Sequence, residues 1–495
     1  MAIVIIHEQD NVAVTIKPVK KGQTVSYGGH DLIVQEDIDK GHKLALRNIA
    51  AGENIVKYGF PIGHALQAVA AGHWLHTHNI KTNLGDILEY KYEPTPPYAA
   101  GREQCDKTFR GYKRSDGRVG TRNEVWIIPT VGCVNRTAQL LAKTGREQAV
   151  AAGVDGVFEF THAYGCSQLG DDHQATRTIL LDLVKHPNAG AVLVLGLGCE
   201  NNTIAEFKAA LGEYNPARVK FLVTQDVEDE LTTGTELLTE LIAYAGQFSR
   251  IDCPVAELTV GLKCGGSDGF SGITANPLVG SFSDLLISCG GSTVLTEVPE
   301  MFGAETILMN RAQDEAVFTK TVKLINDFKQ YFQAYNQPVY ENPSPGNKKG
   351  GISTLEDKSL GCTQKGGRST VVDVLAYGER VHTKGLNLLQ GPGNDAVACT
   401  ALAAAGCQVV LFTTGRGTPL GTAVPTVKVA TNSELFRHKP HWMDFDAGQL
   451  LAGKTMAEVT DEFFDFVVAV ASGQETKAEK MGFREIAIFK NGVTL

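Results

Sequence analysis

Alternating apolar and polar residues characterise the beginning of the chain. The alternation runs through 12–16, 31–35 and 54–58, and glycine-containing turns separate these stretches. A period of two is the pattern of a β-strand with one buried and one exposed face. The pattern predicts a small, mostly β domain over residues 1–92.

A proline-containing segment separates this region from one with a different pattern. Residues 93–110 include three prolines, a composition typical of a linker. Beyond it, continuous apolar runs alternate with stretches whose apolar residues recur at helical spacing, as in a parallel sheet covered by helices on both faces. The predicted strands are 125–129, 156–160, 191–195 and 219–223, and the predicted helices lie near 136–151, 173–186, 203–212 and 226–247.

The same rhythm continues to the end of the sequence. Strands are predicted at 258–262, 292–296, 386–389, 409–412 and 426–430, and helices at 311–336, 395–405 and 456–472. A chain of 495 residues is too long for one hydrophobic core. We therefore predict an α/β protein with a β domain over 1–92, a linker over 93–110, an α/β domain over 111–255 and a C-terminal α/β domain over 256–495.

Chemically active side chains gather where predicted strands end. The densest stretch, 160–173, contains His162, Cys166 and His173 between an apolar run and a helical pattern. In open α/β sheets, ligands bind outside the carboxyl ends of the strands. The alternative is a well-capped turn in which these side chains are only packed. Similar loops occur at 196–202, 263–268 and 360–365.

Two further segments bear on the site. The segment 342–351 is rich in proline and glycine, and the polar 356–365 that follows favours an active-site loop over a flexible linker. In the β domain, His76 and His78 are two positions apart, so on a strand they would face the same side and present two imidazoles to one ion. Ordinary titrating histidines at an exposed strand end are the alternative.

Charge and targeting signals narrow the class of protein. The formal net charge of -9, without a run of Lys and Arg, argues against a nucleic-acid-binding surface. We find no basic segment followed by a long apolar one at the N-terminus, hence no signal peptide. The best apolar run, 189–197, is far shorter than the roughly 20 residues that span a membrane. The cytoplasm is the expected location, and no membrane partner is expected.

Ten cysteines are too few for a disulfide scaffold in a chain of this size, so we expect free thiols. No Cys-x-x-Cys pair occurs, which argues against a zinc ribbon. The loop cysteines leave an iron–sulfur cluster open; they stand at positions 133, 166, 199, 264 and 362.

Residues 448–455 match the phosphate-loop pattern literally, but no good core strand precedes them and their middle favours a helical turn. The loop at 196–202 lacks the third glycine of a dinucleotide fingerprint, and Gly-x-Ser-x-Gly is absent. We therefore set aside nucleotide binding, dehydrogenase and serine-hydrolase functions.

Specific motifs along nearly the whole chain resemble the altronate/galactarate dehydratase family. They include the stretch from Tyr164 to His173, and others lie at 41–43, 76–79, 130–135, 186–190, 199–202, 264–268, 297–305, 341–347, 393–397 and 415–419. The resemblance implies an N-terminal SAF (β-clip) domain, larger α/β domains and a lyase that depends on Fe(II) or Mn(II). It implies dehydration of the sugar acid D-altronate to 2-dehydro-3-deoxy-D-gluconate in galacturonate breakdown, with galactarate or a related aldarate as the alternative substrate.

Such a dehydration removes the proton at C2, expels the hydroxyl at C3 and lets the enol collapse to a 2-keto acid. It needs an electrophile at the carboxylate, a base and an acid. We expect metal ligands among His76, His78 and His42, with Glu200 or Asp268 completing the shell. Proton transfer is expected from His162, His173 or Lys365. For the substrate we expect Arg416 to clamp the carboxylate, with Asn135 and Ser267 as further contacts.

Two alternatives remain open: an iron–sulfur dehydratase that uses the loop cysteines, and a non-catalytic sugar-acid-binding or scaffold protein. The sequence does not fix the oligomeric state, and a homo-oligomer is one option. Because candidate metal ligands concentrate before residue 80 and the other candidates follow residue 130, we expect a composite active site between the domains.

Overall fold

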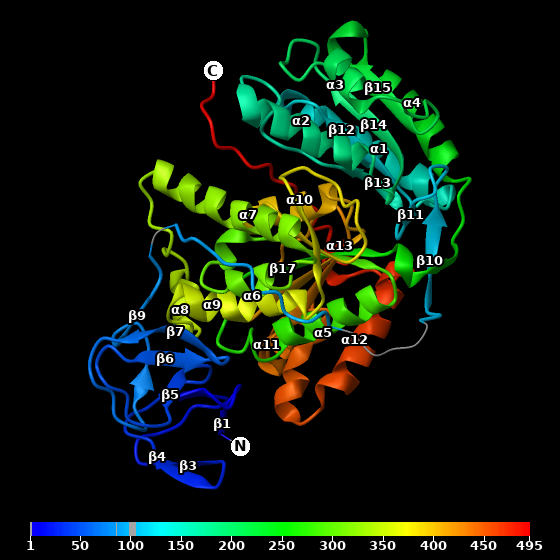
Figure 1. Ribbon diagram of the computed structural model, residues 1–495. Helices are drawn as coiled ribbons and strands as arrows, with labels where there is room; N and C mark the ends of the chain where they lie inside the picture. The colour runs from blue at the N-terminus through cyan, green and yellow to red at the C-terminus, as the bar shows by residue number, and fades with distance from the viewer. Residues whose placement is uncertain (1, 86, 99–104) are drawn as a thin grey trace.

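Three domains and a connecting segment make up the chain (Figure 1). The computed structural model describes residues 2–85, 87–98 and 105–495. The mostly β domain and the α/β domain that follows the linker lie at opposite ends of the view, with the C-terminal domain between them. The predicted fold class, a small SAF-like β domain followed by parallel-sheet α/β domains, is confirmed.

The N-terminal domain consists of short strands around two small apolar clusters. Glycines at positive φ close several of its turns, for example Gly22 and Gly52, because a side chain rarely adopts that conformation. The sheet orders are β1-β2-β5-β8, β3-β4 and β6-β7-β9. The strands are β1 Ile3–Val4, β2 Val12–Thr15, β3 Thr24–Tyr27, β4 His30–Ile33, β5 Lys43–Ala45, β6 Asn54–Lys57, β7 Phe60–Ala65, β8 Trp74–Leu75 and β9 Ile80–Lys81.

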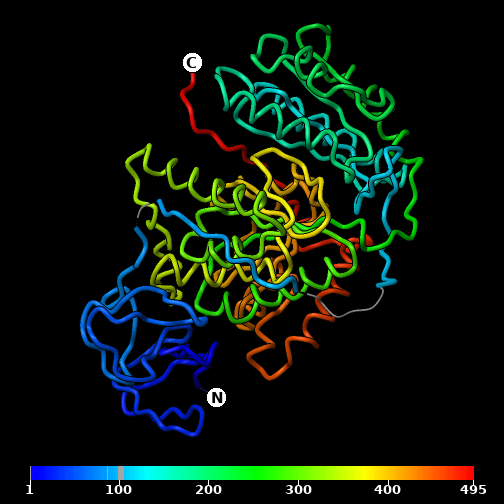
Figure 2. Tube along the Cα trace, in the orientation of Figure 1, coloured from blue at the N-terminus to red at the C-terminus, as the bar shows by residue number. Residues whose placement is uncertain are grey.

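The segment after this domain lies along the C-terminal domain (Figure 2). The Tyr90 hydroxyl donates to Glu305 at 2.5 Å, and the Tyr92 hydroxyl donates to the carbonyl of Ala312 at 2.8 Å. Residues 99–104 of the predicted linker lie outside the described residues, and its last positions belong to strand β10, Thr108–Lys113. Cys105 forms a disulfide with Cys289, so the expectation of free thiols throughout is wrong for this pair, which the path of the segment brings together.

The second domain has a parallel sheet in the order β13-β12-β14-β15. Every residue of β12 and β14 is buried, as the continuous apolar runs predict. Helices α1 and α4 pack on one face, and α2 and α3 on the face toward the C-terminal domain. The elements are β12 Glu124–Pro129, α1 Asn135–Ala151, β13 Gly156–Glu159, α2 Gly170–Val184, β14 Ala189–Gly196, α3 Ile204–Leu211, β15 Val219–Val223 and α4 Glu230–Ala245; an antiparallel sheet of β10 Thr108–Lys113, β11 Val119–Gly120 and β16 Ile251–Pro254 adjoins them.

The C-terminal domain is built on a seven-stranded parallel sheet in the order β19-β20-β18-β17-β21-β22-β23. The chain leaves β17 toward β18 and later returns to β21 on the other side, so the switch point lies between β17 and β21. Its strands are β17 Thr259–Cys264, β18 Ser292–Leu295, β19 Val371–Leu375, β20 Leu386–Leu389, β21 Val409–Thr414, β22 Thr426–Ala430 and β23 Phe445–Asp446. Its helices are α5 Ala275–Ser288, α6 Glu305–Met309, α7 Glu315–Ala334, α8 Pro345–Lys349, α9 Leu355–Cys362, α10 Asp395–Ala404, α11 Ser433–His438, α12 Met456–Ala471 and α13 Lys477–Met481.

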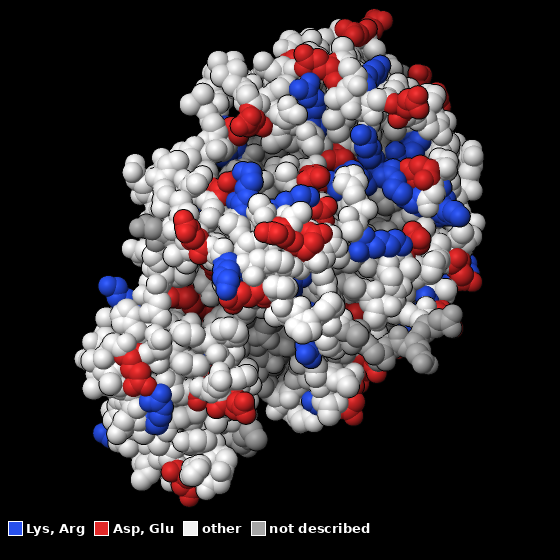
Figure 3. Space-filling model, in the orientation of Figure 1, with Lys and Arg blue, Asp and Glu red and all other residues white. Residues whose placement is uncertain are grey.

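Acidic and basic side chains are interspersed over the face drawn in Figure 3, without a broad field of one sign. Within the described part of the chain, no helix is long and apolar enough to span a bilayer.

Candidate active site

A pocket of about 940 Å³ opens at the switch point of the seven-stranded sheet. The loops that follow four neighbouring strands contribute to its wall: Gly265 after β17, Glu300 after β18, Asp395 after β20 and Thr418 after β21. The segment around α8 and Lys358 of α9 complete it. This is the place where open α/β sheets bind ligands.

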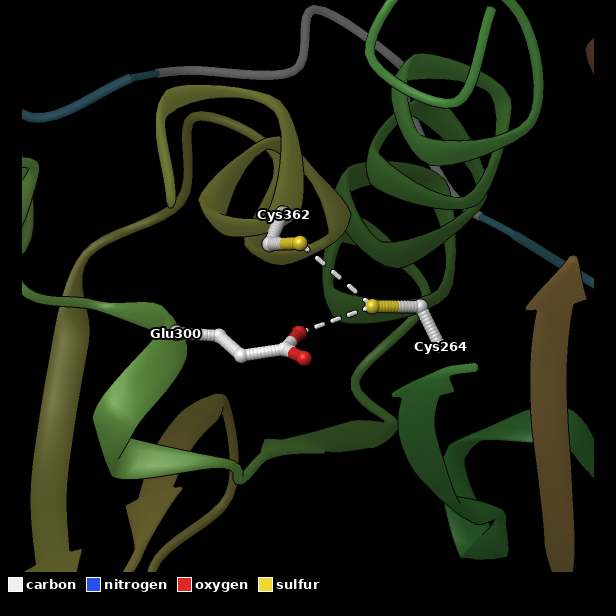
Figure 4. A group of neighbouring side chains, drawn as sticks. All are labelled: Cys264, Glu300 and Cys362. Atoms are coloured by element: carbon white, nitrogen blue, oxygen red, sulfur yellow. Dashed lines mark hydrogen bonds between the residues drawn. The ribbon is translucent and has the colours of Figure 1, made fainter. Parts of the chain in front are cut away.

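Glu300 of the pocket wall belongs to a buried group of three side chains (Figure 4). Cys264, at the end of β17, lies 3.0 Å from a carboxylate oxygen of Glu300 and 3.4 Å, sulfur to sulfur, from Cys362 at the end of α9. Three elements far apart in sequence therefore bring two thiols and a carboxylate together.

Three buried lysines surround this group. The Lys358 ammonium lies 2.7 Å from Glu300, and that of Lys365 lies 2.9 Å from the Cys264 sulfur. Lys263 pairs with Glu297 and, at 2.9 Å, with Asp395. The sequence analysis missed most of this network. The signals for it were a lysine inside an apolar strand, Lys263, and the two acids of 297–300 directly after β18.

The two glutamates of this network differ in their electrostatic environment. Burial, together with the negative charge of Glu300, raises the pKa of Glu297. Burial acts on Glu300 in the same direction, but the positive charges of Lys358, Lys365 and Lys263 outweigh it and hold the pKa of Glu300 well below its usual range. Two carboxyl groups with pKa values moved apart are a common arrangement at acid–base sites.

The backbone at Glu297 is unusual. Its φ of 71° lies in the left-handed region, which residues other than glycine rarely adopt. This conformation turns the carboxylate back toward β17, where it accepts a hydrogen bond of 3.0 Å from the backbone N–H of Cys264. Non-glycine residues held in this region cluster at functional sites.

The N-terminal domain docks beside the pocket through a buried charge cluster. Asp357 of α9 lies 2.8 Å from the Lys43 ammonium and 2.9 Å from that of Lys57, and all three side chains are buried. The Lys43 ammonium also donates to the carbonyl of Gly351 at 2.7 Å. The N-terminal domain thus docks on the C-terminal domain, but none of its described residues lines the pocket, and the composite active site stays a prediction.

Two of the three predicted histidine ligands meet at this docking surface. The rings of His42 and His76 have centroids 5.0 Å apart. The Trp74 indole N–H donates to Nδ1 of His42 at 3.1 Å, so Nε2 of a neutral His42 carries the proton and faces the carbonyl of Lys349 at 3.4 Å. Nδ1 of His76 lies 3.0 Å from the Ser353 hydroxyl, and His78 is exposed.

These histidines do not form a ready site for a single Fe(II) or Mn(II) ion. Both nitrogens of His42 are engaged, and only Nε2 of His76 and the His78 ring remain. Within the described ranges, only Cys264, Glu300 and Cys362 form a group of three His, Cys, Asp or Glu side chains with ligand atoms within 4.8 Å of one another. Lysine ammonium groups already contact these side chains, so a divalent cation would have to displace the lysines.

The remaining predicted residues lie in two separate places. In the second domain, both nitrogens of the buried His162 ring are engaged, one with the carbonyl of Pro129 and one with the backbone N–H of Tyr164. Asn135 donates to the carbonyl of His162 at 2.7 Å. Glu200 accepts hydrogen bonds from Thr130 and from the N–H groups of 197–198, so the structure does not bring it to the histidines.

His173, in the first turn of α2, lies 4.0 Å from Glu206 and does not line the pocket. In the C-terminal domain, Asp268 is buried and accepts hydrogen bonds from Phe270, Ser271 and Thr431. Ser267 is buried beside it, and its hydroxyl has no partner among the described residues. Arg416 is exposed in the loop after β21 that also supplies Thr418 to the pocket wall.

Comparison with known proteins identifies all three domains of the chain. Three family models match: the altronate/galactarate dehydratase SAF domain over 1–83, the D-galactarate dehydratase/altronate hydrolase second domain over 111–246, and the D-galactarate/altronate dehydratase C-terminal domain over 255–494. Altronate dehydratase of Bacillus subtilis is 59% identical over 99% of both chains. Galactarate dehydratase (L-threo-forming) of Escherichia coli is 35% identical over 98% of this chain and 96% of its own.

A third relative divides the same architecture between two chains. The beta subunit of (2R)-sulfolactate sulfo-lyase from Chromohalobacter salexigens is 30% identical over 77% of this chain and 97% of its own. The alpha subunit is 33% identical over 86 residues, which are 16% of this chain and 92% of the subunit, a length that fits the N-terminal domain. Because all three domains match their family models and full-length relatives align from end to end, the chain belongs to the altronate/galactarate dehydratase family.

Proposed function

We propose that this protein is a hydro-lyase that dehydrates D-altronate to 2-dehydro-3-deoxy-D-gluconate and water, in hexuronate catabolism. One observation carries the proposal. The chain is 59% identical to an altronate dehydratase over 99% of both chains but 35% identical to a galactarate dehydratase. A cytoplasmic location and assembly into a homo-oligomer are retained as predictions.

The pocket at the carboxyl edge of the C-terminal sheet is the proposed place of reaction. Lys358 and Glu300 line it, and both are held in their charged forms. Burial alone would lower the pKa of Lys358, but the negative charge of Glu300 outweighs this effect and raises it. The same pairing favours the charged form of Glu300. The ammonium can bind an anionic sugar acid and stabilise the departing C3 hydroxyl. Two carboxylates of the wall, Glu300 and Asp395, are the candidates to accept the C2 proton.

These assignments revise the expected proton-transfer residues. Lys365 is buried beneath the pocket, where its interactions with Cys264 and with the Glu297 carboxylate oppose the effect of burial and raise its pKa. It therefore holds Cys264 and Glu297 in position, whereas His162 and His173 belong to the second domain. Dependence on Fe(II) or Mn(II) is retained as a prediction, and no step here passes through a mononuclear ion.

A substrate panel tests the proposal. Protein purified without oxygen and supplied with Fe(II) or Mn(II) is assayed for 2-keto acid release from several aldonates and aldarates. We expect kcat/KM for D-altronate to exceed that for galactarate at least about tenfold, the size of discrimination that a few pocket contacts provide. A panel in which galactarate is preferred would overturn the substrate, and binding without turnover would favour a sugar-acid-binding protein.

A further inference from the structure

Three exposed cysteines stand at the carboxyl ends of three neighbouring strands in the second domain. Cys133 follows β12, Cys166 follows β13 and Cys199 follows β14, and the sheet order is β13-β12-β14. All three are free thiols. None of them takes part in the pocket of the C-terminal domain.

Residue counts from the paired strand ends place the three cysteines at similar positions in their loops. Pro129 pairs with Leu195, and Cys133 and Cys199 each follow four residues after these partners. Ile127 pairs with Glu159, and Cys166 lies seven residues beyond Glu159 while Cys133 lies six beyond Ile127. Because neighbouring strands are about 4.8 Å apart, the loops that carry the three cysteines leave the sheet side by side.

Each of the three cysteines follows a glycine, and the glycines before Cys133 and Cys166 bring their loops into close contact. A side-chain carbon on Gly132 would lie 2.9 Å from the carbonyl oxygen of His162, and one on Gly165 would lie 1.9 Å from that of Thr130. Only glycine allows the loops to approach this closely.

Hydrogen bonds connect the same loops. The N–H of Gly132 donates to the carbonyl of Tyr164 at 2.8 Å, and that of Asn202 donates to the carbonyl of Gly165 at 3.0 Å. Two buried polar atoms beside the cysteines, Nε2 of Gln168 and Oδ1 of Asn202, have no partner among the described residues. Hydrogen bonds thus connect the loops, and two of their buried polar atoms remain able to form further hydrogen bonds.

We propose that Cys133, Cys166 and Cys199 hold an iron–sulfur cluster of the [4Fe–4S] type. A structural zinc site takes four protein ligands and a disulfide takes two thiols, so a set of three exposed thiols fits neither. Such a cluster would be held by these three cysteines and would supply Lewis-acid chemistry toward the oxygens of a hydroxy acid. Dehydration changes no oxidation state overall, so the cluster needs no electron donor.

Hydrogen bonds link the loop of Cys166 through the C-terminal segment to helix α7. The backbone N–H of Leu495 donates to the carbonyl of Ser167 beside Cys166, and the Tyr335 hydroxyl, just past α7, donates to Asn491 of the same C-terminal segment. Phe332 of α7 lines the pocket. The inference rests on the proposed dehydration, and it supplies an iron site where the histidines and the Cys264 group do not offer a ready one.

The test is metal analysis of full-length protein purified without oxygen and reconstituted with iron(II) and sulfide. We expect about four iron and four acid-labile sulfide per chain, with broad visible absorbance. Cys133→Ser, Cys166→Ser and Cys199→Ser should each lose most of the sulfide and absorbance. The matched control is Cys253→Ala, a buried thiol in β16 outside the site, which should keep both.

Iron without sulfide in the wild-type protein, or full sulfide in all three serine variants, would overturn the cluster. Circular dichroism checks that the variants fold, as exposed positions should allow. Altronate turnover is measured on the same samples. Turnover by protein that contains iron but no sulfide would contradict the cluster and support the dehydratase function. A cluster in protein that turns over no sugar acid would contradict the dehydratase function.

Discussion

At the scale of single residues, Lys358 and Glu300 depend on each other. Their charged atoms are 2.7 Å apart, and the two side chains are 8% and 6% exposed. Replacing Lys358 by methionine removes the ammonium group in direct contact with a buried carboxylate, which should lower the free energy of unfolding by about 3–5 kcal/mol. Loss of the group that assists the departing hydroxyl should also lower kcat/KM for D-altronate by about 10²- to 10⁴-fold.

Two further variants separate the structural effect from the chemical one. Lys358→Met combined with Glu300→Gln should recover most of the stability, measured by denaturant unfolding, but not the activity. Lys91→Met is the control, because the Lys91–Glu93 pair is 85% and 64% exposed and contributes little. Wild-type activity in Lys358→Met would remove this residue from the site.

At the scale of elements, the contact between α9 and the N-terminal domain should weaken in acid. Burial, with the charges of Lys43 and His42, lowers the pKa of His76 to about 3, whereas an undocked histidine titrates near 6.5. Between these values the undocked form binds a proton that the docked form does not, so docking is strongest above about pH 6.5 and is lost as the pH falls. Small-angle scattering from about pH 7 to pH 4 should show the radius of gyration increase.

Asp357 should control the same contact at neutral pH. Burial opposes its ionisation, but Lys43 and Lys57 hold the pKa of Asp357 below its usual range. Asp357→Asn leaves two lysines facing each other without an anion, and it should expand the protein already at pH 7. Asp37→Asn removes an exposed partner of Lys20 and should change nothing measurable. An equally compact Asp357→Asn protein would contradict this account of docking.

Most strands and helices could be predicted from the sequence, but the contacts between distant elements could not. Periodicity placed strands such as 219–223 and 426–430 at the bounds that the structure has. It missed helix α8 inside a segment rich in proline and glycine, because capping by Ser344 and the neighbouring chain decide that helix. It also gave no sign that Asp357 meets Lys57, since a partner 300 residues away leaves no local pattern.

At the scale of the whole molecule, the N-terminal domain should work as a separate chain. It has an apolar cluster of its own and shares a second with Ala304 and Leu360 of the C-terminal domain, and a relative's separate alpha subunit is similar to a stretch of this length. Residues 1–85 and 87–495 produced as two chains should reassemble and recover activity as their concentration rises, because cutting the connection removes only the effective concentration that it provides.

The activity of each piece and of the mixture is the measurement. The larger piece alone should be inactive if the site is composite, and full activity in that piece would refute this arrangement. Asp357→Asn in the larger piece should prevent recovery, which ties reassembly to the docking charges and not to unspecific association.

The separation between the docking lysines and Asp357 also has a consequence during synthesis. At about 5–20 residues per second, the 300 residues between Lys57 and Asp357 take about 15 to 60 s to emerge from a ribosome. Throughout that interval the N-terminal domain can fold on its own but has no partner, and water solvates the ammonium groups of Lys43 and Lys57. The growing chain therefore carries the N-terminal domain with two hydrated ammonium groups on its docking surface until α9 is made, and docking then has to remove that water.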